Sequence, residues 1–157
     1  RILIQQHSGK QSISPNVDKF LSFEKEWGIS NIEKYRSFAG RVKRAKSDIL
    51  KLLDDFKSSQ VQVGGYGAPA KGNTLLNYLE AGPTMIAYIA DNNPFKQGKV
   101  TPGTHIPVIS DQEFLDKNPS HALLLAWNYL EFFLKNSDYI KQGGKFIVPL
   151  PSPKILP

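Results

Sequence analysis

From Gln60 onward, short apolar runs alternate with segments of helical periodicity. This alternation is typical of parallel strands joined by crossover helices, because such strands are buried on both faces by the helices between them. We expect five strands, at Val61–Tyr66, Met85–Ala90, Ile106–Ile109, Ala122–Trp127 and Lys145–Leu150. We expect three intervening helices, near Ala70–Glu80, Asp111–Lys117 and Tyr129–Gln142. The predicted fold class is therefore α/β: a Rossmann-like, doubly wound, mainly parallel five-stranded sheet, with strand order 3-2-1-4-5.

The residues before Gln60 have a different pattern. Ser14 and Pro15 are typical of a helix start, and Gly28 of a helix end. A second, long amphipathic helix is predicted from Ile32 to about Lys57. We therefore expect a helical arm over residues 10–59 and a Rossmann-like domain over residues 60–157. Residues 1–9 are interpreted as the last strand of a preceding domain, so that the chain is expected to be a fragment.

Composition excludes several classes of protein. The 157 residues include no cysteine and only three histidines, which lie far apart in the sequence, so we expect no disulfide and no metal site. No apolar run approaches the ~20 residues of a membrane span, and the expected location is the cytoplasm. The net charge is +6, but acidic residues accompany the basic cluster Arg41–Lys46, which favours a solvated helix face over nucleic-acid binding.

The most informative motif is the glycine-rich bend that leaves the first strand and opens a helix. Gly65-x-Gly67-x-x-Ala70 fits the dinucleotide-binding pattern, in which small residues let the backbone approach a ligand at a helix N-terminus. Free backbone N–H groups there favour an anion, and Lys71 adds a cation that could reach a phosphate. The alternative is that these glycines only permit close packing of helix on strand.

Two further positions lie at predicted strand ends. Asp91 follows the second strand, where a dinucleotide fold carries its ribose-binding acid, but it could equally form a turn with its own backbone. Trp127 and Asn128 end the fourth strand, and the predicted strand order places them opposite the bend. They could instead be a core aromatic and a helix cap. His105 lies in a long polar loop without an identifiable partner.

Several segments, taken together, resemble a known family. These are Gly65–Tyr78, Asp91–Lys99, Thr101–Val108, Leu124–Asn128 and Gly143–Pro151. In order and spacing they are similar to the C-terminal domain of sugar C-methyltransferases. The resemblance implies an enzyme with an upstream zinc-binding domain and a middle domain that binds S-adenosylmethionine. It also implies methylation of a keto-deoxysugar carried on a nucleoside diphosphate, typically dTDP.

By the same resemblance, substrate lies between the middle and C-terminal domains, and the catalytic base lies upstream of Arg1. We therefore assign no catalytic residue to this chain and expect it to be inactive alone. From the expected geometry, the substrate-binding candidates are Gly65, Tyr66, Gly67, Ala68, Lys71, Asn73, Thr74, Trp127 and Asn128. Two other interpretations remain open: a nucleotide- or CoA-binding module associated with sugar acyl transfer, and a non-catalytic scaffold domain.

Overall fold

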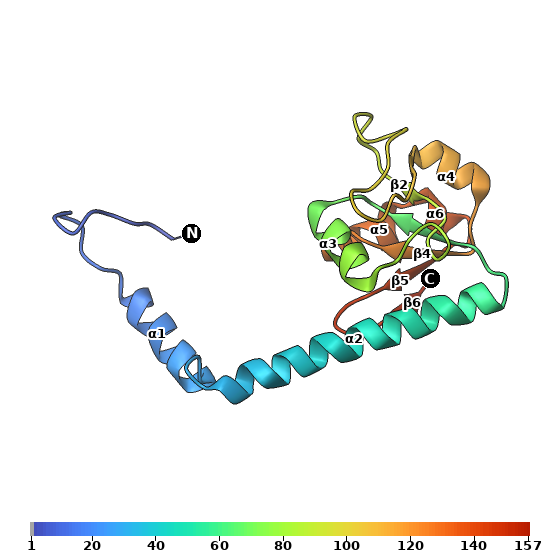
Figure 1. The fold of residues 1–157 in the computed structure, drawn as a ribbon. Coiled ribbons are helices and arrows are strands. Elements are labelled where there is room, and N and C mark those ends of the chain that lie inside the picture. The colour runs from blue at the N-terminus through green and yellow to red at the C-terminus, as the bar shows by residue number, and fades with distance from the viewer. Residues whose placement is uncertain (1) are drawn as a thin grey trace. The chain divides into compact units, whose positions relative to one another are not determined.

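A computed structural model describes residues 2–157. The chain divides into two compact units, one ending at Arg41 and the other beginning at Val42. The second unit contains a six-stranded sheet with strand order β3-β2-β1-β4-β5-β6 (Figure 1). The strands are β1 (Val63–Tyr66), β2 (Ile89–Ala90), β3 (Val108–Ile109), β4 (His121–Leu124), β5 (Lys145–Val148) and β6 (Lys154–Leu156).

The sheet confirms the predicted fold class. Strands β1 to β5 are parallel to one another and follow the predicted order. The prediction missed β6, which pairs antiparallel with β5 through Ile147 and Ile155. Its three residues follow a segment containing three prolines, residues 149–153, and so short a strand has no periodic pattern to reveal it. Three of the five predicted strands also begin earlier in the sequence than the observed ones.

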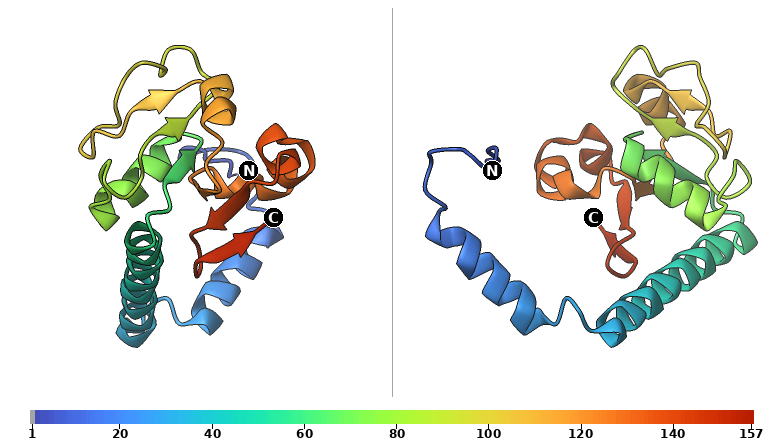
Figure 2. Two further views of the ribbon diagram at one scale, coloured as in Figure 1. Left: turned by 90° about the vertical axis from the view of Figure 1, so that its right-hand side faces the viewer. Right: turned by 60° about the vertical axis from the view of Figure 1, so that its left-hand side comes forward.

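Helices cover the sheet on both faces (Figure 2). The helices of the described residues are α1 (Pro15–Trp27), α2 (Ile32–Ser58), α3 (Ala70–Leu79), α4 (Asp111–Lys117), α5 (Leu130–Asn136) and α6 (Asp138–Lys141), with a 3₁₀ turn, η1, at Trp127–Tyr129. Of these, α1 belongs to the first unit and has no part in covering the sheet. The helix predicted near Tyr129–Gln142 is two helices, because the backbone of Ser137 is extended. The predicted strand end at Trp127 is wrong as well, since Trp127 lies in η1.

Side chains alternate between the two faces of the sheet along each strand, so the strands contribute to two separate cores. Leu123 and Ile147 belong to the core on one face, which includes Ile49 and Leu53 of α2 and Leu76 of α3. The core on the other face is rich in aromatic rings, with Phe114, Phe146 and Tyr139 fully buried. The strands therefore lie between two apolar layers, as the continuous apolar runs of the sequence predicted.

The first unit consists of α1, the beginning of α2 and the residues before them. Ser14 accepts a hydrogen bond from the Asn16 amide at the start of α1, and Gly28 ends the helix in the left-handed conformation, as predicted. Residues 2–9 form no strand, although a strand was expected there. A strand needs a neighbour to pair with, and none of the strands in the described residues pairs with this segment. That it belongs to a preceding domain stays a prediction.

Candidate functional site

The glycine-rich bend connects β1 to α3, as predicted. Two of its backbone N–H groups are already bonded within the protein. The Gly67 amide donates to the Ala90 carbonyl oxygen at 2.8 Å, and the Ala68 amide donates to Asp91 Oδ2 at 2.7 Å. The expectation of free amides for an anion is therefore wrong at Gly67 and Ala68.

Asp91 is the side chain that closes the bend. Its carboxylate is 9% exposed and also accepts hydrogen bonds from the Asn93 amide at 3.0 Å and from Lys96 Nζ at 3.1 Å. Lys96 Nζ donates in addition to the Ala68 carbonyl oxygen at 3.0 Å. The Asp91–Lys96 pair thus satisfies both the donor and the acceptor of the Ala68 peptide. Both sequence interpretations of Asp91 missed this contact, which links two strand ends 23 residues apart.

The charge state of Asp91 follows from these contacts. Burial acts to raise its pKa, but the hydrogen bonds from Ala68 and Asn93 and the charge of Lys96 outweigh burial, so the pKa lies below its usual value. The neighbouring Asp111 behaves in the opposite way. Burial raises the pKa of Asp111, and the negative charge of Asp91 raises it further. Asp91 therefore remains an anion at neutral pH, and Asp111 binds a proton more readily than an exposed carboxyl does.

A cavity of about 200 Å³ opens beside the bend. Twelve residues from β1, β2, α4, η1, α5 and the loops after β1, β2 and β4 line it: Tyr66, Gly67, Ala68, Pro69, Ala90, Asp91, Asn92, Lys96, Asp111, Ala126, Tyr129 and Phe133. The cavity lies at the carboxyl ends of β1, β2 and β4, where the strand order reverses between β1 and β4. This switch point is where open α/β sheets bind their ligands. Its lining combines three aromatic rings with two carboxylates and one ammonium group.

Lys71, Trp127 and Asn128 come together next to this cavity, as the strand order predicted. Lys71 Nζ lies 4.5 Å from the centroid of the Trp127 ring and donates a hydrogen bond to Asn128 Oδ1. The alternative interpretation of Asn128 as a helix cap is wrong, since α5 has no side-chain cap. The lysine charge is therefore held at the start of α3 by an aromatic face and an amide, without a carboxylate partner among the described residues.

The first turn of α3 retains its own donors. The amides of Ala70, Lys71 and Gly72 have no hydrogen-bond acceptor among residues 2–157, as is usual for the first turn of a helix. In the same turn, Asn73 Oδ1 is buried without a partner in the described structure. The Thr74 hydroxyl donates back to the Ala70 carbonyl oxygen at 3.2 Å. The donors that an anion could use thus lie at the start of α3, beyond the bend.

Some of the glycines are explained by packing. A Cβ atom added to Gly65 would lie 2.7 Å from Ile89 Cγ1, and one added to Gly72 would lie 2.7 Å from Leu125 Cβ. Gly65 is therefore buried inside the sheet rather than presented to a ligand. Gly67 has a left-handed backbone with φ of 78°, which glycine adopts readily. The packing interpretation thus accounts for Gly65 and Gly72, and the turn accounts for Gly67.

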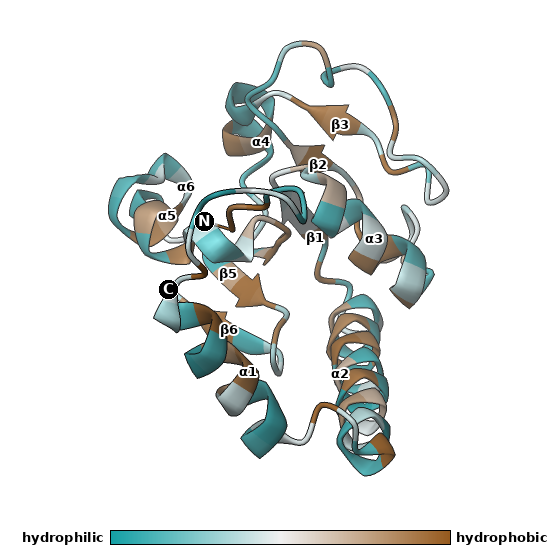
Figure 3. Cartoon of the chain, turned by 90° about the vertical axis from the view of Figure 1, so that its left-hand side faces the viewer, coloured by the Kyte–Doolittle hydropathy of each residue, from teal (hydrophilic) through white to brown (hydrophobic). Residues whose placement is uncertain are grey.

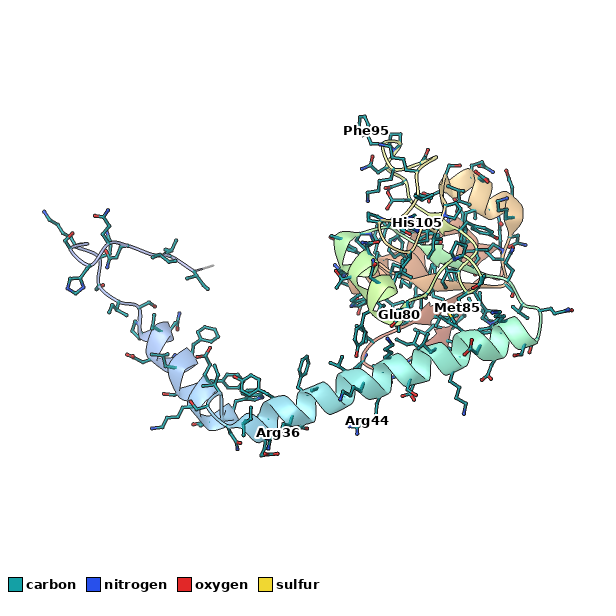
Figure 4. All side chains as sticks on the ribbon, in the orientation of Figure 1. Arg36, Arg44, Glu80, Met85, Phe95 and His105 are labelled. Atoms are coloured by element: carbon teal, nitrogen blue, oxygen red, sulfur yellow. The ribbon has the colours of Figure 1, made fainter. Side chains whose placement is uncertain are left out.

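The sequence interpretation missed several cavity residues. Asp111 begins the helix after β3, and Tyr129 ends the 3₁₀ turn after β4, so their position after a strand was the available signal. Lys96 was part of a polar loop with no feature that distinguished it from Lys99. His105 lies in that loop, exposed and outside the cavity lining; it is labelled together with Phe95 in Figure 4.

A doubly wound α/β sheet with a cavity at its switch point defines a Rossmann-like domain. Among residues 2–157, no helix has the length and apolar character needed to cross a bilayer.

Comparison with known proteins identifies the family. The chain belongs to the C-methyltransferase C-terminal domain family, whose profile matches residues 1–151. It is 37% identical over 145 residues to C-methyltransferase NovU of Streptomyces niveus. The alignment covers 92% of this chain and 34% of that relative, so the chain spans about a third of the length of the curated relative it matches. The resemblance inferred from the sequence motifs is confirmed.

The residues at the end of β2 do not fit an adenosine cofactor in the usual Rossmann manner. In that manner, an acid at this position binds the ribose hydroxyls. Here both oxygens of Asp91 are engaged by Ala68, Asn93 and Lys96. This disagrees with a nicotinamide or S-adenosylmethionine site at the bend. That S-adenosylmethionine binds to another domain of the enzyme stays a prediction.

Proposed function

We propose that this chain is the substrate-side domain of an S-adenosylmethionine-dependent C-methyltransferase that acts on a nucleoside-diphosphate-linked keto-deoxysugar, typically dTDP-linked. Its role is to bind and orient the nucleotide sugar, while the catalytic base and the S-adenosylmethionine site lie in other domains of the polypeptide. The proposed partners of this domain are accordingly a middle, cofactor-binding domain and a zinc-binding domain. Membership of the C-methyltransferase C-terminal domain family supports this proposal.

The observation that carries the proposal is the placement of charge on either side of Pro69. On the α3 side, Lys71 and the unpaired first-turn amides present positive charge and donors, which suit a diphosphate. On the cavity side, Asp91 and Asp111 outnumber Lys96, which is already paired with Asp91. A phosphate is therefore disfavoured in the cavity, whose aromatic lining suits an uncharged part of the substrate.

The nine candidate residues divide accordingly. Lys71, Trp127 and Asn128 form the proposed diphosphate side, together with Asn73, whose buried oxygen could accept a hydrogen bond from a ligand hydroxyl. Tyr66, Gly67 and Ala68 border the cavity, which we propose receives the sugar or the base. Gly65 shapes the bend from within the sheet, and Thr74 is bonded to its own helix, so neither is proposed to touch the substrate.

Replacement of Lys71 tests this proposal. In the complete enzyme, Lys71→Ala should raise KM for the nucleotide sugar about tenfold with little change in kcat, because an interaction equally strong in the ground state and the transition state is lost. Steady-state kinetics measure both constants. The matched control is Lys43→Ala, because Lys43 is an exposed lysine of α2 and is not part of the proposed site. An unchanged KM in Lys71→Ala would remove the start of α3 from the site.

A second candidate function is favoured by one observation. Because Asp91 closes the bend with the protein's own carboxylate, the domain could serve as a scaffold without a ligand of its own. In that case neither Lys71→Ala nor any change in the cavity lining alters KM, whereas changes that unfold the domain abolish activity.

A further inference from the structure

Helix α2 carries one continuous apolar stripe that is buried along only part of its length. Within the second unit, Ala45, Ile49 and Leu53 of this stripe are buried. The same stripe continues toward the start of the helix with Ile32, Tyr35 and Phe38, at the helical spacing of one face. These three side chains are 59%, 45% and 56% exposed. Figure 3 shows the apolar bands recurring along α2.

Helix α1 carries a second unburied apolar face. Its residues Val17, Phe20, Leu21, Phe23 and Trp27 are all exposed, and none of the residues of α1 is buried. With only 13 residues, α1 is at the length where an isolated helix is marginal in water, ~12–15 residues. A helix that short, with an apolar face, is ordinarily stabilised by packing against another surface.

The two helices of the first unit are joined in a defined way. The Trp27 and Tyr35 rings contact each other edge to face, with centroids 6.0 Å apart. The Tyr35 hydroxyl donates to the Ile29 carbonyl oxygen at 2.7 Å across the turn. We use the name arm surface for Phe20, Phe23, Trp27, Tyr35 and Phe38. Its aromatic side chains are thus presented by two helices whose junction is fixed by local contacts.

We propose that the arm surface docks against another folded domain of the longer polypeptide. This inference rests on the proposed function, in which this chain works with other domains. The aligned relative is about three times as long as the matched region, and the family description places this domain at the C-terminal end of such proteins. The α2 part of the arm surface, Tyr35 and Phe38, also continues the stripe by which α2 packs into the core of the second unit.

The charges around the arm surface argue against two other occupants. In α1, Asp18, Glu24 and Glu26 accompany Lys19 and Lys25, and the start of α2 carries Glu33 with three basic residues, Lys34, Arg36 and Arg41. Charges of both signs are therefore nearly balanced around the arm surface, which lacks the predominantly cationic polar face that attracts anionic lipids and nucleic acid. An apolar protein surface is therefore the occupant that the side chains favour.

Hydrogen exchange followed by mass spectrometry tests the docking directly. In the complete enzyme, at a concentration where sedimentation shows a monomer, the amides of Pro15–Trp27 should exchange at least about tenfold more slowly than in the 157-residue chain alone. Phe20→Ser and Phe38→Ser should each reduce that protection. The matched control is Phe132→Ser, since Phe132 of α5 is 59% exposed and lies outside the arm surface.

Two results would overturn the proposal. One is equal exchange of α1 in the complete enzyme and in the chain alone. The other is protection that appears only with dimerisation of the chain, which would identify a second copy as the occupant. Calorimetric binding of the nucleotide sugar does not depend on this result, so docking and the proposed function can fail separately.

Discussion

At the scale of single residues, Asp91 determines the state of the glycine-rich bend. Its position after β2 could be predicted from the sequence, and both the ribose-binding and the turn interpretation were consistent with that position. The turn interpretation is partly confirmed by the hydrogen bond from the Asn93 amide. The bond from Ala68 could not be predicted, because it depends on the parallel pairing that places the ends of β1 and β2 side by side.

The charge of Asp91 should be measurable as stability. Asp91→Asn keeps the shape but removes the anion, which leaves Lys96 unpaired and weakens the bond from Ala68. We expect the free energy of unfolding at pH 7 to fall by about 1–3 kcal/mol in urea denaturation. Asp54→Asn, at an exposed site of α2, should change it little. Because the folded pKa of Asp91 lies below its unfolded value, its contribution is present above about pH 4 and is lost as the pH falls through the folded pKa.

The Asp91→Asn variant should therefore lack that part of the acid dependence of stability. Equal stability of wild type and variant at pH 7 would show that Asp91 does not hold the bend closed.

At the scale of elements, the sequence predicted those features, such as helix starts, that depend only on neighbouring residues. The helix predicted near Asp111–Lys117 is α4, and Ser110 caps its start by accepting a hydrogen bond from the Glu113 amide. The division between α5 and α6 at Ser137 was not predictable in the same way. The Ser137 hydroxyl lies 3.3 Å from the Tyr66 hydroxyl, a partner on β1 that no local pattern reveals. The cluster of Lys71, Trp127 and Asn128 was predictable because it follows from strand order alone.

Because α3 packs closely on the end of β4, replacing a glycine by alanine should affect stability differently in α3 and in α2. Gly72→Ala places a Cβ atom 2.7 Å from Leu125 Cβ, so we expect a loss of about 1–3 kcal/mol in thermal or urea unfolding. Gly40→Ala in α2 meets nothing within 4 Å, and it should stabilise the helix by up to about 1 kcal/mol. Stabilisation by both substitutions would show that α3 does not pack this closely.

At the scale of the whole molecule, the protein has a Rossmann-like fold, but its glycine-rich bend is closed by Asp91, the position at which such folds bind the ribose of a cofactor. The sheet order places the cavity at the switch point, as the sequence predicted. The carboxylates that line this cavity make it negatively charged, and the lysine at the start of α3 makes that neighbouring region positively charged. This separation is the physical basis for proposing that the diphosphate and the uncharged part of the substrate bind on opposite sides of Pro69.

Titration calorimetry with dTDP, NAD and CoA tests that claim most directly. The account predicts that dTDP binds to the chain, that Lys71→Ala weakens its affinity about tenfold, equivalent to ~1.4 kcal/mol, and that Lys43→Ala leaves it unchanged. Binding of NAD or CoA without dTDP, or equal dTDP affinity in wild type and Lys71→Ala, would contradict it.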